Sequence, residues 1–424
     1  MNYIVSKFKK NINFLTGLIV LLPIFIIIGN LAINLASFLI IIIGILKFKE
    51  TIIKYLKSLK IYLTILLVFF ILNILFSSDY FYSLKGSLGI IRYILLSAII
   101  FFWFNNKKDN FLLFLISIFI SVFIVAVSVF VEFGYKNAFD LINDRNSGLF
   151  FDELVAGSYI SKFICALLLF FVLDTRKLKL NSTSVLLILF FAYLGIFFAL
   201  GRAPFIMANV GIIFFLFFTK KIKLLNKFII ILACTIIFFS SYNLNTYVKI
   251  KTDYTLYQLG FKKLIGQKSL NTFSSGGEPD NFLESKWGSH FITAYEMGKK
   301  SFIVGNGIKT FRKDCRKDEF LSKKFDQGSA AKRCSTHPHN IYFELFAETG
   351  ILGLLIFFYF HFLMFKKIYY NSNTEIKIIS LSIILVLFFP IQTSGSYFST
   401  FNGIYYFLNI SIINFLNNKK KITL

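Results

Sequence analysis

The sequence predicts an all-α, polytopic membrane protein with about twelve transmembrane helices and one large, mostly helical loop outside the cytoplasm. The first observation is composition: 56% of the 424 residues are hydrophobic, 16% are charged and the mean hydropathy is +0.71, which lies outside the range of soluble globular domains. The second is that apolar residues form uncharged blocks of about seventeen residues or more, long enough to cross a hydrocarbon core of ~30 Å. The third is that positive charge is concentrated in alternate connections between these blocks.

The N-terminal apolar block resembles a signal peptide, because it follows a lysine-rich start. It continues to Leu46, however, and no small-residue cleavage site interrupts it, so we expect two uncleaved helices separated near Gly29 and Asn30. Each later block predicts one further span. The predicted spans are residues 13–29, 32–46, 61–78, 87–104, 111–131, 155–173, 183–199, 203–219, 228–245, 341–365, 378–392 and 400–416.

Charge alternation predicts the orientation of the spans. Lysine-rich connections belong on the cytoplasmic side, and the intervening ones, such as residues 134–154 and 201–204, carry far fewer lysines and arginines. With twelve spans, both termini are expected in the cytoplasm. Residues 246–340 then form an outer loop between nine spans in residues 1–245 and three in residues 341–424. The positive connections are residues 7–10, 47–60, 107–108, 176–179, 220–223, 366–367 and 419–421.

The formal net charge of +25 has the same origin. In a soluble protein such a charge would suggest nucleic acid as the partner, but here the lysines cluster between spans, beside lipid headgroups. We therefore expect membrane lipids, and no nucleic acid, among the partners.

The outer loop of roughly ninety residues is too long for a simple connector, so an ordered cap or a functional element is expected. Residues 253–264 and 289–300 each predict a helix, and residues 272–277 predict a flexible stretch. Gly305-Asn306-Gly307 predicts a tight turn. The loop is therefore expected to be mostly helical, without long strands.

The four cysteines divide by location. Cys165 and Cys234 lie in apolar spans, where cysteine is usually a packing residue. Cys315 and Cys334 lie in the outer loop and are candidates for a disulfide, which would stabilise the fold by about 3 kcal/mol; two free thiols are the alternative. No spacing is typical of a Cys/His metal site, and no metal is expected.

Three cations at the outer ends of spans are candidate anion contacts, because charges at such positions are costly. Arg202 occupies a very short turn between two apolar helices, where a guanidinium is suited to phosphate or could extend to lipid headgroups. Arg145 lies in an outer loop and is either a site residue or a solvated charge. Lys162 lies about two turns inside the sixth span, where it could reach headgroups or add a second charge to the same anion.

The most specific segment runs from Thr336 to Asn340, just before the tenth predicted span. Pro338 keeps the backbone extended, Asn340 is a candidate N-cap, and His339 is expected at the mouth of the helix. Imidazole is the side chain best suited to accept a proton from a hydroxyl near neutral pH. A single histidine at a helix start is usually structural, whereas His337 beside His339 favours a functional site.

Two further pairs follow in the same helix. Glu344 and Glu348 are four residues apart and share a face, and Gly350 and Gly353 are three apart, which permits a close helix approach. Two histidines, two carboxylates and arginines on one side of the membrane together predict a functional site at the outer interface.

This segment resembles the signature of the bacterial O-antigen ligase and polymerase superfamily of membrane glycosyltransferases. That signature is His-Asn followed by nine residues, Gly, two residues and Gly. The chain matches it in full at His339-Asn340, Gly350 and Gly353. The likeness also covers the twelve-span layout and the large loop before the signature, and in the first half of the chain it is one of topology alone. The supporting matches are Arg202, the Gly305-x-Gly307 turn and Phe311.

The resemblance implies metal-independent transfer of a glycan from an undecaprenyl diphosphate carrier to an acceptor hydroxyl, with no cofactor. It implies that His339 is the base on the acceptor and that Arg202 contacts the donor diphosphate. From their own positions in the sequence, Arg145 and Lys162 are further candidates for that contact. Diphosphate is a good leaving group once cations neutralise its developing charge, so the residue types fit the chemistry.

One part of the family pattern is missing. The family commonly has a further arginine in the loop before its Gly-x-Gly turn, but residues 284–291 contain none. Lys286 or His290 is expected to take its place. His337, Asn340, Glu344, Glu348 and the two signature glycines are expected to support the site.

The acceptor is open among members of the superfamily. An O-antigen ligase, which uses a hydroxyl of the lipid A core, is favoured over an O-antigen polymerase or a protein O-oligosaccharyltransferase. The alternative from another class is a transporter of lipid-linked oligosaccharide, but the chain shows no repeat and its candidate residues gather at one face. The expected location is the bacterial inner membrane, with the large loop in the periplasm.

Overall fold

The computed structural model describes residues 13–139, 145–151, 153–173, 182–258, 261–265, 271, 282–322, 330–390 and 395–418. Within these residues the fold is entirely helical, with no strand, as predicted. Helices cover each of the twelve apolar segments. They are α2 (Phe14–Val20), α3 (Leu22–Ile28), α4 (Asn30–Ser58), α5 (Lys60–Leu75), α6 (Tyr80–Asn106), α7 (Lys108–Ala138), α8 (Ala156–Leu167), α9 (Leu169–Val172), α10 (Ser182–Phe198), α11 (Arg202–Phe218), α12 (Leu224–Leu244), α18 (Ile341–Tyr369), α19 (Thr374–Phe388) and α20 (Thr400–Leu416).

Five of these helices are long and apolar enough to cross a membrane by length and composition, namely α4, α6, α7, α12 and α18. Together with the shorter apolar helices beside them, they confirm an all-helical membrane protein. The number of twelve spans, and the side of the membrane on which each connection lies, stay predictions.

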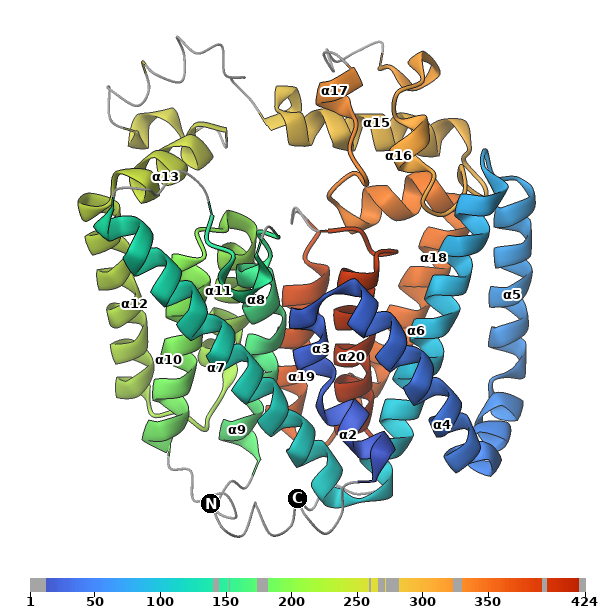
Figure 1. The fold of residues 1–424 in the computed structure, drawn as a ribbon, viewed down its shortest axis with the longest axis horizontal. Helices are drawn as coiled ribbons and strands as arrows, with labels where there is room; N and C mark the ends of the chain where they lie inside the picture. The colour runs from blue at the N-terminus through green and yellow to red at the C-terminus, as the bar shows by residue number, and fades with distance from the viewer. Residues whose placement is uncertain are drawn as a thin grey trace.

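Shorter helices lie at one end of the bundle, where α13, α15, α16 and α17 form a separate layer (Figure 1). These short elements are α13 (Thr246–Gln258), α15 (Lys286–Lys300), α16 (Phe311–Asp314) and α17 (Ala330–Arg333), with the 3-10 turns η1 (Gly148–Phe150), η3 (Lys262–Leu264), η4 (Phe282–Glu284) and η5 (Asp318–Phe320).

The helix expected over residues 253–264 is instead α13, which begins at Thr246, directly after α12, and ends at Gln258. The helix expected over 289–300 begins earlier, at Lys286, because the Ser285 hydroxyl accepts a hydrogen bond from the amide of Gly288 and caps the first turn. The stretch expected to be flexible, 272–277, lies outside the described residues.

The N-terminal break occurs where the sequence predicts it. α3 ends at Ile28, Gly29 adopts a φ of 122°, and α4 begins at Asn30, a backbone conformation that favours glycine. A second break, at Leu21, was not expected from the apolar pattern; Pro23 in the first turn of α3 has no amide hydrogen and begins a new helix there.

A glycine also divides α18, the helix that carries the signature. Gly350 has a φ of 61°, and Figure 1 shows the first turns of α18 lying across the end of the bundle before the helix descends into it. At this break, the amides of Ile351 and Leu352 donate to the carbonyls of Phe302 and Ile303 over 2.8 and 3.1 Å. The break is therefore paired with the loop that follows α15.

Asn73 of α5 also holds the loop that follows α15. Its amide group donates to the carbonyls of Val304 and Glu348 over 2.7 and 2.9 Å, and its oxygen accepts from the Ile308 amide over 3.2 Å. A Cβ on Gly305 would lie 2.4 Å from the backbone of Glu348, so only glycine fits. Asn73 and the Gly305-Asn306-Gly307 turn together fix α15, α18 and α5 to one another.

Candidate functional site

Three histidines and a tryptophan meet at the start of α18. The ring of His339 lies 4.1 Å from that of His337, 4.6 Å from that of Trp287 and 5.3 Å from that of His290, measured between centroids. Trp287 and His290 come from the first turns of α15, which packs against α18. The site therefore joins two segments about fifty residues apart in the sequence.

The backbone at this point is held in an unusual conformation. His339 has a φ of 61°, which L side chains rarely adopt. Asn340, directly after it, caps α18 by accepting hydrogen bonds from the amides of Tyr342 and Phe343 over 2.9 and 3.2 Å. The Asn340 amide group also donates to the carbonyl of Pro390 over 2.8 Å. These bonds fix the direction in which the imidazole leaves the chain.

The segment before His337 is fixed by a disulfide and an arginine. Cys315 and Cys334 are joined, with their Cα atoms 5.3 Å apart. Arg333 is buried and donates to the carbonyl of Arg316 over 2.8 Å and to the carboxylate of Asp318 over 3.0 Å. The loop that carries the histidines is thus attached to α16 and η5 on its other side.

Burial and neighbouring groups keep the imidazoles of His339 and His290 neutral. Burial is the largest cause that lowers the pKa of His339 to about 2, and electrostatic interactions with His337, His290, Lys286 and Arg145 act in the same direction. Burial, followed by the charge of Lys286, lowers the pKa of His290 to about 4. A neutral His339 can accept a proton, and an anion bound beside it would raise its pKa toward the range of an effective base.

His290 is not placed as an anion contact would be. Its side chain is fully buried, and neither ring nitrogen makes a hydrogen bond of standard geometry, although the carbonyls of Lys332 and Cys334 lie nearby. Lys286, in contrast, is exposed at the start of α15 and its charge reaches His339. Of the two residues expected in place of the missing arginine, Lys286 is the exposed cation, and its role as an anion contact stays a prediction.

Arg145 links the histidines electrostatically to Arg202. Its charge acts on both His339 and Arg202. The next residue, Asn146, is buried and donates from its side chain to the carbonyl of Phe198 over 2.7 Å, and the Gly148 amide donates to the carboxylate of Glu132 over 2.6 Å. Arg145 therefore directly precedes residues that are anchored to α7 and α10.

Arg202 contacts α13, which belongs to the separate layer of short helices. It is the first residue of α11, and its guanidinium donates to the hydroxyl of Thr255 over 3.0 Å and lies 5.5 Å from the ring of Tyr254. Both partners belong to α13. This placement favours a site residue over an arginine that extends to lipid headgroups.

Lys162 has a different environment. Its ammonium donates to the side-chain oxygen of Asn402 and lies 4.7 Å from the ring of Tyr405, so α20 holds it. Arg202 is held by α13 instead, and no contact in the described part of the chain joins Lys162 to the arginines. The expectation that Lys162 shares their anion gains no geometric support.

The two carboxylates of α18 are buried and hydrogen-bonded to backbone. Glu344 accepts from the amide of Tyr397 over 2.7 Å and from the hydroxyl of Ser396, and Glu348 accepts from the amides of Lys309 and Phe311 over 2.6 and 3.1 Å. Each is 1% exposed. They hold the loops around α18 and do not face His339 with free oxygens.

The two signature glycines differ in role. A Cβ on Gly350 would lie 2.5 Å from the carbonyl oxygen of Ile303. Gly350 therefore permits the close approach of the loop that follows α15, whereas the close approach of another helix was expected. A Cβ on Gly353 would lie 2.9 Å from the ring of Phe69 in α5, which is the expected close helix approach.

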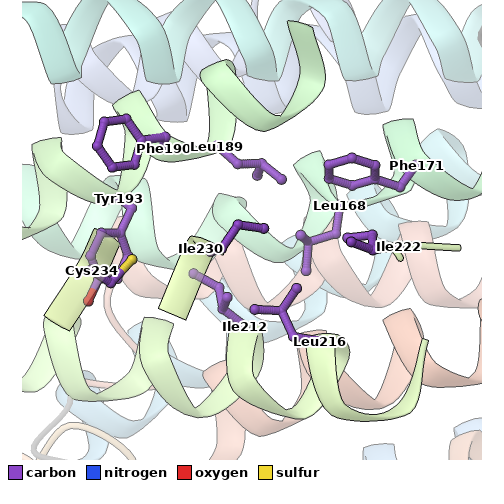
Figure 2. A pocket seen from close by; sticks show the side chains of 10 residues that line it. All are labelled: Leu168, Phe171, Leu189, Phe190, Tyr193, Ile212, Leu216, Ile222, Ile230 and Cys234. Atoms are coloured by element: carbon purple, nitrogen blue, oxygen red, sulfur yellow. The ribbon is translucent and has the colours of Figure 1, made fainter. Parts of the chain in front are cut away.

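A cavity elsewhere in the bundle is unrelated to these residues. Figure 2 shows it between α9, α10, α11 and α12, lined by apolar side chains with the Tyr193 hydroxyl and the Cys234 thiol as its polar groups. It measures about 60 Å³, roughly the space of a few water molecules. It contains none of the candidate site residues and belongs to the packing of the helices.

Sequence reasoning missed several residues around the site. Trp287 and Thr255 gave no signal, because nothing in a single sequence brings α15 to α18 or α13 to Arg202. Arg92 did carry one: an arginine within the predicted span 87–104 is costly in lipid. Asn73, in the span 61–78, is a similar case.

The fold and the site define a helical membrane protein with a histidine and arginine site where a layer of short helices meets the end of the bundle. Residues 184–358 match the family model described as O-antigen ligase. This match confirms the predicted relationship to the O-antigen ligase and polymerase superfamily, whose members are glycosyltransferase-like enzymes. The matched region contains Arg202, the histidine cluster and both signature glycines. No curated protein matches the chain.

Proposed function

We propose that the protein transfers a glycan from an undecaprenyl diphosphate carrier to an acceptor hydroxyl at the periplasmic face of the inner membrane. The observation that carries this is the neutral, half-buried His339 at the start of α18, within reach of the charges of Arg145 and Lys286, with the charge of Arg145 also acting on Arg202. A base and a set of cations are the groups that displacement of a diphosphate requires.

The reaction can be written with these residues. His339 accepts the proton of the acceptor hydroxyl, and the oxygen attacks the anomeric carbon of the donor glycan. The bond from that carbon to the diphosphate oxygen breaks, and the diphosphate leaves with the electron pair. Arg202 and Arg145 stabilise its charge, while Lys286 stands in for the arginine that the family commonly has in this loop.

The proposal includes the orientation and the acceptor. Twelve spans with both termini in the cytoplasm place the site in the periplasm, and the charge alternation of the sequence supports this. A ligase that uses the lipid A core is favoured by the His-Asn signature and the single large loop before it. The polymerase and the protein O-oligosaccharyltransferase use the same site chemistry with another acceptor.

The deciding experiment is reconstituted transfer with a defined undecaprenyl diphosphate glycan and separate acceptors: lipid A core, a second carrier-linked glycan and a hydroxyl-bearing peptide. A ligase is expected to glycosylate the lipid A core alone. In cells lacking the protein, a ligase defect leaves the core without long glycan while carrier-linked polymer accumulates; loss of the polymer itself would contradict the ligase assignment and indicate a polymerase.

A further inference from the structure

A second group of cations lies outside the site described above. Lys85 and Arg92 are seven residues apart on α6, which places them on one face about 10 Å apart along the axis. Lys309 lies between the Gly305-Asn306-Gly307 turn and α16, and Arg312 is the second residue of α16. The charges of Arg312, Lys85 and Arg92 all act on Lys309. We call these four residues the α6–α16 cluster.

The two halves of the cluster are held together by close backbone packing. A Cβ on Gly86, next to Lys85, would lie 2.3 Å from the side chain of Ile308, next to Lys309. Lys309 has a φ of 67°, and its amide donates to the carboxylate of Glu348 over 2.6 Å. The lysine is therefore built into the turn, in a backbone conformation that costs free energy for a side chain other than glycine.

The cluster has an excess of positive charge. None of its four members forms an ion pair within 4.0 Å among the described residues, where ion pairs do form elsewhere in the outer loop. The buried carboxylates of this region are already engaged. Glu344 and Glu348 accept from backbone amides and a hydroxyl, and Asp314 of α16 is paired with Lys317 and accepts from Ser78 and Asn306. The four cations therefore outnumber these buried carboxylates, which are already hydrogen-bonded or paired, and the cluster keeps an excess of positive charge.

Arg92 is the member of the cluster that lies farthest along α6. It lies twelve residues into α6, or about 18 Å along its axis. Two of its nitrogens donate to the side chains of Asn34 and Tyr93 over 2.7 and 2.6 Å, while its Nε is buried without a partner. A charged side chain at this depth is costly unless it is used, and one of its donors remains unfilled.

We propose that the α6–α16 cluster binds the phosphate of an anionic acceptor lipid, so that the acceptor and the donor occupy separate cationic sites. This inference rests on the proposed transferase function. A phosphate monoester carries up to two negative charges and several acceptor oxygens, which matches the excess charge of the cluster. Glu348 connects Lys309 to the helix that His339 precedes, so a bound phosphate would hold the acceptor at a fixed distance from the base.

The test compares acceptors that differ only in phosphate. In the reconstituted assay, Lys309→Gln combined with Arg312→Gln should raise KM for the phosphorylated lipid A core about tenfold or more, with kcat and the donor KM nearly unchanged. With enzymatically dephosphorylated lipid A core, the wild type should already show the higher KM, and the double variant should add no further change. Arg316→Gln, an exposed arginine two residues beyond α16, is the matched control and should behave as wild type. An unchanged acceptor KM in the double variant would overturn the proposal.

A binding experiment separates this inference from the proposed function. The intact protein in nanodiscs is titrated with phosphorylated lipid A core, its dephosphorylated form and phosphatidylglycerol. Binding of the phosphorylated form alone, weakened by Arg92→Gln and by the double variant, supports the acceptor site even if no transfer is found. Equal binding of phosphatidylglycerol, lost in the same variants, would assign the cluster to bulk phospholipid and overturn the proposal.

Discussion

Two groups of ionisable side chains flank Asn340, and they differ in what they contact. Before it, His337 and His339 contact each other, and His339 also contacts the rings of Trp287 and His290 in α15. After it, Glu344 and Glu348 are 1% exposed and each accepts two hydrogen bonds, three of these four from backbone amides. The carboxylates hold loops in place, whereas the histidine nearest the helix is the residue that we propose acts on a substrate. The histidines and the carboxylates are equally conspicuous in the sequence, but their environments in the fold differ.

The largest effect is expected from the histidine side of this comparison. His339→Ala should reduce transfer by about 10²- to 10⁴-fold, the usual contribution of a general base, while the protein remains in the membrane. The measurement is the initial rate in the reconstituted assay at equal protein. The control is His361→Asn, because that histidine packs 4.0 Å from Phe357 and 4.5 Å from Phe388 within the bundle. Retained activity in the alanine variant would rule out His339 as the base.

A somewhat smaller effect is expected at the donor contact. Arg202→Gln should lower kcat/KM for the donor by about 10²-fold, and Arg202→Lys should recover only part of this loss, because a lysine cannot form the two parallel bonds of a guanidinium to a diphosphate. The matched control is Lys221→Gln, an exposed cation just beyond the other end of α11. Equal activity of the two Arg202 variants would show that the planar fork is not used.

The carboxylate side should respond in stability and not in chemistry. Glu348→Gln puts an amide where two backbone amides donate, so we expect a loss of about 1–3 kcal/mol in the free energy of unfolding, measured by thermal unfolding in detergent. Glu319→Gln removes only an exposed partner of Lys300 and should cost under about 1 kcal/mol. A Glu348→Gln protein of normal stability but without transfer would contradict the structural role.

The sequence was sufficient for the features that depend on local pattern. The helical class, the break at Gly29 and the cap at Asn340 follow from hydropathy, backbone freedom and side-chain chemistry. The meeting of His290 with His339 could not be predicted, because it depends on how α15 packs against α18. The burial of Glu344 and Glu348 could not be predicted for the same reason, because their partners lie in loops about forty to fifty residues away in the sequence.

The smallest effect is a pH dependence of stability. The pKa values of His339 and His290 are lowered to about 2 and about 4 in the folded protein, while both are about 6.5 in an unfolded chain. Well above pH 6.5, neither state binds these protons. As the pH falls from 6.5 toward 4, the unfolded chain is protonated first, so the folded state loses stability, by about 1 kcal/mol for each group at pH 5.5.

Thermal unfolding in detergent at pH 7.5 and pH 5.5 measures this loss. The variant His290→Phe should lose less stability between the two values than the wild type does, because one of the two imidazoles is gone. The carboxylate variant Glu348→Gln should keep the wild-type histidine dependence, since it leaves both imidazoles in place. If His290→Phe lost as much stability on acidification as the wild type, His290 would not be neutral and buried in the folded protein.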